Sequence, residues 1–255
     1  MPEASLHIAN DFILYEDGLT PRPRLEWVQP GHWRDQGALG EALGGRGQVW
    51  SVRTPVGPAV LRRYQRGGWV RGISRDQYVY LGVARSRAVR EFRLLEHLRR
   101  LQLPVPGPIM ASCECGTGVS AWQYRCGLLT REIPGAETLA SLAPDLGSQD
   151  WKAIGHTLGR FFKVGLQHPD LNASNLVCSN LVRSNLVGSD LVGDGNQHGD
   201  QQWWLLDLDK AHCGSRPSRP QPMLKRLQRS LNKQRQRADE SALWAGVAQG
   251  MDSKP

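Results

Sequence analysis

Long apolar runs are missing from this sequence: no stretch approaches the roughly 18 apolar residues that a membrane-spanning helix needs. The first twelve residues lack the basic start and apolar stretch of a secretory signal, so we expect a protein that stays in the cytoplasm. Cysteine is scarce, with five residues among 255, and the odd number argues against a disulfide scaffold. Two of them form a Cys113-x-Cys115 pair, but no further ligand follows at a zinc-site spacing.

Positive charge, in contrast, is in excess. The chain has 32 Lys and Arg against 24 Asp and Glu, a net charge of +8, and its pI is near 9.6. This balance suits nucleic acid, an anionic membrane surface or a phosphorylated substrate as a partner. Helix-turn-helix, zinc-finger and RNA-binding patterns are absent, so no nucleic-acid partner is expected. Apolar residues at 40% and charged residues at 22% are typical of an ordinary folded chain with a sizeable core.

Short strands are expected in the first half of the chain. Residues 49–53 and 58–64 are rich in strand-forming side chains, and the TPVG between them predicts a hairpin. Further strands are expected near residues 78–81, 109–111 and 121–130. The first 40 residues show no clear pattern.

Helices dominate the second half. Leu and Phe side chains at helical spacing predict helices over residues 87–103 and 151–166. A strand-rich front and a helical back indicate an α+β protein with two lobes rather than alternating βαβ units. We place the lobes at residues 1–130 and 131–255.

An internal repeat interrupts the second lobe. Residues 174–193 read SNLVC, SNLVR, SNLVG and SDLVG, and a stretch without apolar residues follows. Four copies of five residues are too few to bury a solenoid core. We therefore expect a surface-loop insertion at about residues 176–202.

Two polar motifs carry the chemistry. The run HPDLNASN, residues 168–175, places Asn175 five residues after Asp170. The run WWLLDLD, residues 203–209, is an apolar strand that ends in Asp207. Phosphoryl transfer from a nucleotide needs one carboxylate at the attacking hydroxyl, and an amide oxygen and a second carboxylate that hold Mg²⁺. We expect His168 to hold the loop through hydrogen bonds rather than to act in the chemistry.

These motifs resemble the lipopolysaccharide kinase family of the protein-kinase-like superfamily. The resemblance extends over about residues 40–235 through VLRRYQRGGWV, REFRLLEHL, LPVPGPI, HPDLNASNLV, LLDLDKAH and LKRLQRSLNK. It implies a two-lobed protein-kinase-like fold with a nucleotide-binding first lobe and a catalytic second lobe. It also implies ATP as the donor, Mg²⁺ as the cofactor, and a lipid A precursor bearing 3-deoxy-D-manno-octulosonic acid (Kdo) as the acceptor, phosphorylated on the 4-hydroxyl of Kdo. The expected location is the cytoplasmic face of the inner membrane, as a peripheral protein on its anionic surface.

The resemblance also assigns roles to residues. Asp170 accepts the proton of the acceptor hydroxyl, and Asn175 and Asp207 hold Mg²⁺. In the first lobe four residues bind the donor: Gly45 and Gly47 in a glycine-rich turn over the phosphates, Arg62 on a strand beside the phosphates, and Glu91 on a helix as the partner of Arg62.

Several departures from the wider kinase pattern leave alternatives open. Arg62 stands where such kinases keep a lysine, and the two side chains are not equivalent. Asp209 competes with Asp207 as a metal ligand. The repeat offers Asn180 and Asn185 in the same SNLV context as Asn175, although only Asn175 has the five-residue spacing from Asp170.

For each of two basic segments, a surface role is one interpretation. A stretch with interleaved aromatics suits an acceptor or membrane contact, a solvated loop or a nucleic-acid surface: Arg62, Arg63, Tyr64, Arg66, Trp69, Arg71 and Arg75. The helix expected near residues 224–233 has a leucine stripe among basic residues, which suits membrane binding or packing on its own lobe. Other functions stay open: a small-molecule kinase of the aminoglycoside-phosphotransferase kind, a basic nucleic-acid-binding protein, and a kinase disabled by the repeat insertion.

Overall fold

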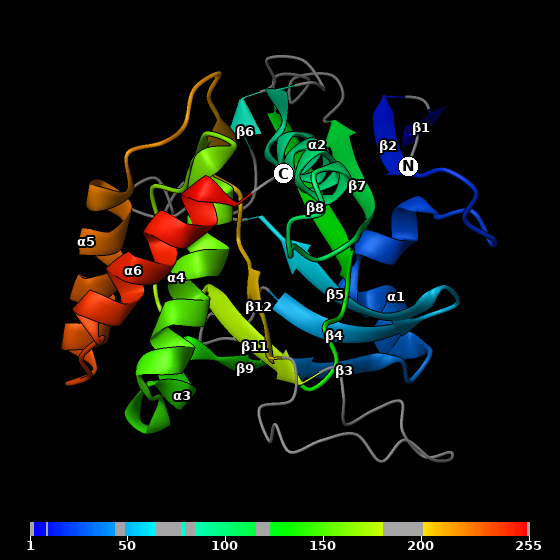
Figure 1. The fold of residues 1–255 in the computed structure, drawn as a ribbon. Coiled ribbons are helices and arrows are strands. Elements are labelled where there is room, and N and C mark those ends of the chain that lie inside the picture. Colours follow the sequence, from blue (N-terminus) through cyan, green and yellow to red (C-terminus); the bar gives the residue numbers. More distant parts are fainter. Residues whose placement is uncertain are drawn as a thin grey trace, which may run out of the picture. The chain divides into compact units, whose positions relative to one another are not determined.

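A computed structural model describes residues 3–8, 10–43, 49–64, 78–79, 85–115, 123–180 and 201–253. Its internal contacts divide the chain into two compact units (Figure 1). The first unit comprises Met1–Arg100 and Pro106–Glu132, and the second comprises Leu101–Val105 and Ile133–Pro255. The predicted division lies after residue 130.

The first unit is built on an antiparallel sheet. Its strand order is β1 (Glu3–Ile8), β2 (Asp11–Glu16), β7 (Pro108–Cys115), β8 (Gln123–Arg131), β5 (Gly57–Arg63), β4 (Val49–Thr54) and β3 (Leu39–Ala42), and the short β6 (Tyr78–Val79) pairs with β8. The expected hairpin is present as β4 and β5, paired from Val49 opposite Arg62 to Thr54 opposite Gly57. Strands β1 and β2 come from the region that showed no pattern.

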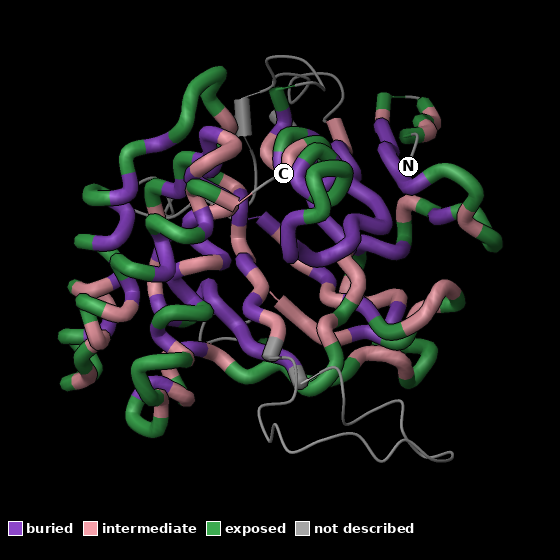
Figure 2. Tube along the Cα trace, viewed as in Figure 1, coloured by how far each residue is buried: buried purple, intermediate pink, exposed green. Residues whose placement is uncertain are grey.

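Helix α2 (Arg87–Arg100) lies against β7 and β8. It ends three residues before the predicted end, ahead of the proline-rich run that leads into β7. Buried residues run along β2, β7 and β8 of this sheet (Figure 2), and two tryptophans add to the core. Trp27 lies in a 3-10 turn (Leu25–Val28) and Trp33 in helix α1 (Pro30–Asp35), and the Trp33 indole N–H donates to the Trp27 carbonyl oxygen at 2.7 Å.

The second unit is mainly helical. Its helices are α3 (Leu139–Leu142), α4 (Ser148–Lys163), α5 (Pro220–Lys233) and α6 (Glu240–Asp252), with a 3-10 turn at Ala143–Asp145. Two small antiparallel sheets accompany them: β12 (Gln201–Leu205), β11 (Leu176–Asn180) and β9 (Glu137–Thr138) in one, and β10 (Leu166–Gln167) with β13 (His212–Cys213) in the other. The α+β class, with a strand-rich first part and a helical second part, is as predicted.

Helices α4 and α6 pack through glycines on both sides. A Cβ added at Gly155 of α4 would overlap the carbonyl oxygen of Leu243, and one at Gly246 of α6 would overlap that of Lys152. Gly159 and Gly250, four residues further along each helix, face the partner backbone in the same way. Small residues therefore let the two helix backbones approach closely, and any larger side chain would force them apart.

The structure revises one expectation for the second unit and decides between the two alternatives of another. The expected loop at about residues 176–202 begins and ends as strand, because β11 pairs with β12 from Leu176 opposite Leu205 to Asn180 opposite Gln201. Residues 181–200 lie outside the described residues. The leucine stripe of α5, which includes Leu224 and Leu227, is buried within its own unit, which decides for packing over membrane insertion. None of the described helices is long and apolar enough to cross a membrane.

Candidate active site

The HPDLNASN run forms a tight loop between β10 and β11. The backbone N–H of Leu171 donates to the His168 carbonyl oxygen at 3.2 Å, and that of Asn175 donates to the Asn172 carbonyl oxygen at 3.1 Å. The side-chain amides of Asn172 and Asn175 both donate to the Asp170 carbonyl oxygen, at 3.0 and 3.1 Å. The loop backbone at Asp170 is thus fixed from two sides, while its carboxylate is half-exposed.

His168 connects this loop to the second motif. Its side chain is buried, and the Asp170 N–H donates to Nδ1 at 3.3 Å. Because Nδ1 accepts, the ring hydrogen is on Nε2, which lies 3.2 Å from the Leu206 carbonyl oxygen and donates to it. Burial lowers the pKa of His168, more than its contact with Leu206 and the nearby Asp207 and Asp170 raise it. A histidine that holds the loop through hydrogen bonds was the sequence expectation, and these contacts agree with it.

Asn175 and Asp207 flank a pair of adjacent strands. Asn175 precedes β11, Asp207 follows β12 by two residues, and the Leu206 N–H donates to the Asn175 carbonyl oxygen at 2.8 Å. Asp207 has a φ of 58°, a left-handed conformation that non-glycine residues adopt mainly at turns and functional sites. The two predicted metal ligands are therefore on segments joined by hydrogen bonds.

These residues fit Mg²⁺ by their donor chemistry. The Asn175 amide uses Nδ2 to donate to Asp170, which directs Oδ1 elsewhere as an acceptor. An amide oxygen and the Asp207 carboxylate are hard ligands of the kind that Mg²⁺ prefers. The described part of the chain has no cluster of three or more His, Cys, Asp or Glu side chains of metal-site geometry. Water and nucleotide phosphates would therefore complete the coordination, as is usual for Mg²⁺ in phosphotransferases.

One face of helix α5 contacts the loop along its length. The contacts are the His168 N–H donating to Met223 Sδ at 3.2 Å, Arg226 Nη1 pairing with Asp170 Oδ1 at 3.2 Å, and the Ala173 N–H donating to Ser230 Oγ at 3.2 Å. Met223, Arg226 and Ser230 are three and four residues apart, so they share this face. Arg226 was expected only as one of the basic residues around the leucine stripe, and a contact between this helix and the loop was not predicted.

In the first unit, Arg62 and Glu91 are in contact as predicted, with Arg62 Nη1 3.4 Å from Glu91 Oε1. Tyr64 is a third member that the sequence analysis assigned to a surface segment. It is buried, and its hydroxyl donates to Glu91 Oε2. The Arg62 and Arg87 guanidinium carbons lie 5.5 and 5.1 Å from the centre of its ring. Burial, and then the negative charge of Glu91, raise the pKa of Tyr64 well above its usual value.

Other candidates are less informative. Gly45 and Gly47 lie outside the described residues, and so do Arg66, Trp69, Arg71, Arg75 and Asn185. Arg63 pairs with Glu114 at 2.7 Å within the first unit, so this arginine is not free for a surface contact. Asp209 is half-buried two residues beyond Asp207 and stays an alternative ligand. None of the five cysteines, which all lie in the described part of the chain, forms a disulfide.

Comparison with known proteins agrees with these motifs. The sequence model of the lipopolysaccharide kinase (Kdo/WaaP) family matches residues 31–246. A 3-deoxy-D-manno-octulosonic acid kinase of Xanthomonas euvesicatoria pv. vesicatoria is 38% identical over 225 residues, which are 88% of this chain and 81% of the relative. A 3-deoxy-D-manno-octulosonic acid kinase of Stenotrophomonas maltophilia is 36% identical over 201 residues, 78% of this chain and 71% of the relative.

A solved structure of WaaP in complex with acyl carrier protein has the same fold. It superposes with a TM-score of 0.50 over 94% of this chain and 98% of that chain, at 14% sequence identity. The predicted two-lobed kinase-like fold is confirmed by this likeness. The roles of the individual site residues stay predictions.

Proposed function

Because the chain belongs to the lipopolysaccharide kinase (Kdo/WaaP) family and is an ATP-dependent sugar kinase of lipopolysaccharide biosynthesis, we propose that its acceptor is Kdo on a lipid A precursor. The bond formed joins the 4-hydroxyl oxygen of Kdo to the γ-phosphorus of ATP. The bond broken links that phosphorus to the β–γ bridging oxygen, and ADP leaves. The observation that carries the proposal is the loop in which Asp170, Asn175 and the segment of Asp207 are joined by hydrogen bonds.

Asp170 takes the proton of the attacking hydroxyl in this proposal. Its backbone is fixed by His168 and by two side-chain amides, while its carboxylate is half-exposed and open to a substrate. A positioned general base contributes about 10² to 10⁴ in rate. Asn175 and Asp207 would hold Mg²⁺, which when bound neutralises the charge of the phosphates. Arg62, held by Glu91 and Tyr64, would contact the phosphates of the donor.

Phosphate transfer from labelled ATP to a Kdo-bearing lipid A precursor tests the proposal. We expect labelling that requires Mg²⁺, stops with EDTA, and falls by about 10² or more in Asp170→Asn. Asp145→Asn, at an exposed position of the same unit, is the matched control and should keep full activity. Asp209→Asn distinguishes the two candidate metal ligands, because it should be far less damaging than Asp207→Asn.

The acceptor has its own test. NMR of the product would place the phosphate on the 4-hydroxyl or on another oxygen. A folded wild-type protein that labels no Kdo acceptor would overturn the proposal. Equal phosphorylation of a soluble sugar without its lipid would favour a small-molecule kinase.

We propose that the protein binds the anionic inner-membrane surface by charge at its cytoplasmic face. Helix α5 presents an exposed basic face of Lys225, Arg226, Arg229 and Lys233 while its leucines are buried. Each such residue close to an anionic surface contributes about 1 kcal/mol, and salt screens the attraction. Co-sedimentation with anionic phospholipid vesicles should therefore occur at low salt and weaken as salt is added.

A further inference from the structure

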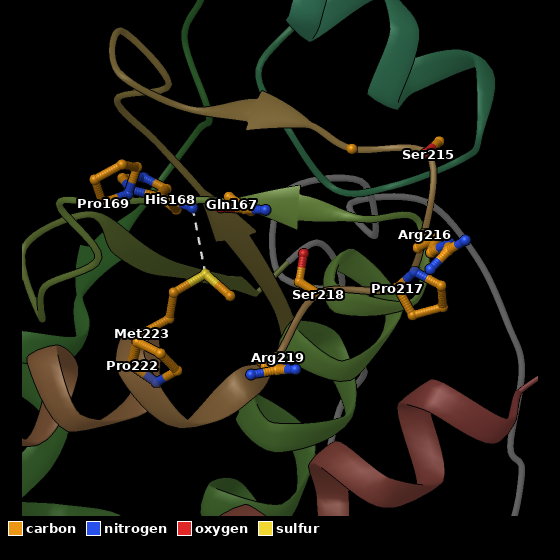
Figure 3. A pocket seen from close by; sticks show the side chains of 11 residues that line it. Gln167, His168, Pro169, Ser215, Arg216, Pro217, Ser218, Arg219, Pro222 and Met223 are labelled. Carbon is orange, nitrogen blue, oxygen red and sulfur yellow. Dashed lines mark hydrogen bonds between the residues drawn. The ribbon is translucent and has the colours of Figure 1, made fainter.

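A cavity of about 620 Å³ lies beside the candidate catalytic loop in the second unit. Gln167, His168 and Pro169 form one side, and the segment from Gly214 to Arg219 forms the other (Figure 3). Pro222 and Met223 of helix α5 complete the lining. The cavity begins at the residue before Asp170, but Asp170, Asn175 and Asp207 do not line it. A substrate bound in this cavity would lie next to Asp170 without occupying the predicted metal site.

The lining has a single sign of charge. It contains no Asp or Glu, and it contains two arginines, Arg216 and Arg219. His168 adds no charge near neutral pH because burial lowers its pKa. Both arginines are exposed, and neither forms a salt bridge within the described part of the chain. Two unpaired guanidinium groups beside a neutral wall favour a carboxylate or a phosphate, which arginine binds through paired hydrogen bonds.

The wall that carries the arginines is anchored to the unit. The Gly214 N–H donates to the Gly165 carbonyl oxygen at 2.9 Å, and the Ser218 N–H donates to the Phe162 carbonyl oxygen at 2.8 Å. The Ser218 hydroxyl donates to the Leu166 carbonyl oxygen at 2.5 Å. These bonds tie residues on both sides of Arg216 to the segment that leads into the catalytic loop. The cavity is therefore largely formed before a ligand binds.

Helix α5 connects the cavity to Asp170. Arg219 immediately precedes the helix, Met223 lines the cavity one turn later, and Arg226 reaches Asp170 in the following turn. Met223 and Arg226 are three residues apart and so lie on one helix face, and Arg219 stands at the N-cap just before the first turn. A ligand seated in the cavity thus lies along the same face that leads to the proposed base.

We propose that this cavity is the acceptor-binding site, in which Arg216 and Arg219 bind an anionic group of the acceptor. The inference rests on the proposed function, because that function supplies an acceptor with both a sugar carboxylate and lipid phosphates. The recognised chemistry is a singly or doubly charged oxyanion. The apolar lining of Pro169, Pro222 and Met223 suits the carbon skeleton that carries it.

The test compares Arg216→Gln, Arg219→Gln and the double variant with Arg237→Gln. Arg237 is an exposed arginine of the same unit that lies outside α5 and does not line the cavity, so it controls for loss of charge. We expect each cavity variant to raise the KM for the Kdo-bearing lipid A precursor about tenfold or more, as expected for a lost charge-assisted hydrogen bond. The KM for ATP and ATP hydrolysis without acceptor should not change. Equal acceptor KM values in the cavity variants and in Arg237→Gln would overturn the inference.

Two modified acceptors identify the anionic group. An acceptor with its Kdo carboxylate methylated, or one with its lipid phosphates removed, should bind weakly to the wild type. With the acceptor that lacks the relevant anion, the wild type and the double variant should bind equally well. If the double variant remains weaker with both modified acceptors, both anions contact the arginines, and if neither modification affects binding, the inference fails.

Direct binding separates this inference from the proposed function. The Kdo-bearing precursor in detergent micelles, with ADP present, should bind the wild type and Asp170→Asn equally and the double arginine variant weakly. That result without any phosphate transfer would retain the cavity and overturn the reaction. Transfer with unchanged binding in the arginine variants would retain the reaction and overturn the cavity. Thermal unfolding of each variant confirms that a loss of binding is not a loss of folding.

Discussion

His168 donates from Nε2 to the carbonyl oxygen of Leu206, 3.2 Å away, and so joins the loop of Asp170 to the strand end that carries Asp207. The ring must be neutral for this arrangement, because Nδ1 accepts a hydrogen bond from the Asp170 N–H. A second proton on the ring would break that contact and place a charge in a buried site. The geometry of the candidate active site is thereby linked to one protonation state.

This link predicts a loss of stability in acid. The ordinary pKa of a histidine, 6.5, applies in the unfolded chain, and burial lowers the pKa of His168 in the folded chain. Below about pH 6.5 the unfolded chain therefore binds more protons than the folded chain, and the free energy of unfolding decreases as the pH falls. Above about pH 6.5 the contribution of His168 to the free energy of unfolding is fully present. Urea unfolding at several pH values between 7.5 and 5 measures this slope.

His168→Gln should reduce that slope. His156→Gln is the comparison variant. Burial also lowers the pKa of His156, but its side chain is only half-buried and joins no second motif, so this variant should reduce the slope less than His168→Gln does. A His168→Gln protein with the slope of the wild type would contradict the prediction.

The hydroxyl of Tyr64 predicts an effect on nucleotide binding. Tyr64→Phe removes only the hydrogen bond to the buried carboxylate of Glu91, and leaves the ion pair between Glu91 and Arg62 in place. We expect about 1 kcal/mol of lost stability and a severalfold rise in the KM for ATP, since Arg62 is held less firmly. Steady-state kinetics and urea unfolding measure the two effects. Tyr15→Phe, at a buried tyrosine of β2, should leave the KM for ATP unchanged.

Arg226 should matter more for catalysis than for stability. Its side chain and that of Asp170 are 49% and 50% exposed, so the 3.2 Å ion pair contributes at most about 1 kcal/mol to folding. Yet it is a charged contact of the proposed base, and it orients that carboxylate. We expect Arg226→Ala to lower kcat about tenfold with little change in unfolding. Arg226→Lys should recover part of this loss, whereas Arg229→Ala should have no effect on kcat.

The glycines between α4 and α6 predict a large loss of stability. Gly155→Ala or Gly246→Ala places a methyl group against a backbone carbonyl of the partner helix, and overpacking of this kind costs about 1 to 3 kcal/mol or more. Gly31→Ala in helix α1 makes the same chemical change where nothing lies within 4 Å of the new Cβ. Helix propensity then favours alanine by up to about 1 kcal/mol. Urea unfolding should therefore show opposite signs for the two positions.

Local patterns made part of this fold predictable. The hairpin of β4 and β5 was predictable because both strands are rich in strand-forming residues and a short turn joins them. Helices α2 and α4 were predictable because their apolar residues recur at helical spacing. Strand β2 was missed because its run from Phe12 to Tyr15 is buried throughout and shows no alternation. Helix α6 was missed because glycines stand where an apolar stripe would otherwise mark the packed face.

The candidate site likewise has one part that the sequence predicts and another that it does not. Asp170 and Asn175 share one loop, so their spacing was visible in the sequence. Tyr64 contacts Glu91 across 27 positions, and Arg226 contacts Asp170 across 56, so no local spacing marks either pair. The cavity beside His168 likewise depends on a segment more than 40 residues later, brought close by the pairing of β10 with β13.

The hairpin of β11 and β12 makes the last prediction, on the repeat. Asn180 lies opposite Gln201 in the antiparallel register, so a two-residue Asn-Gly turn can join these strands in place of residues 181–200. Asn175 and Asp207 lie beyond the other end of the same pair of strands, and their positions depend on the pairing of Leu176 with Leu205. We expect the shortened protein to fold and to keep the kcat of the parent in the phosphate-transfer assay. A large gain would mean that the repeat inhibits the enzyme, and a complete loss in a folded variant would mean that residues 181–200 belong to the site.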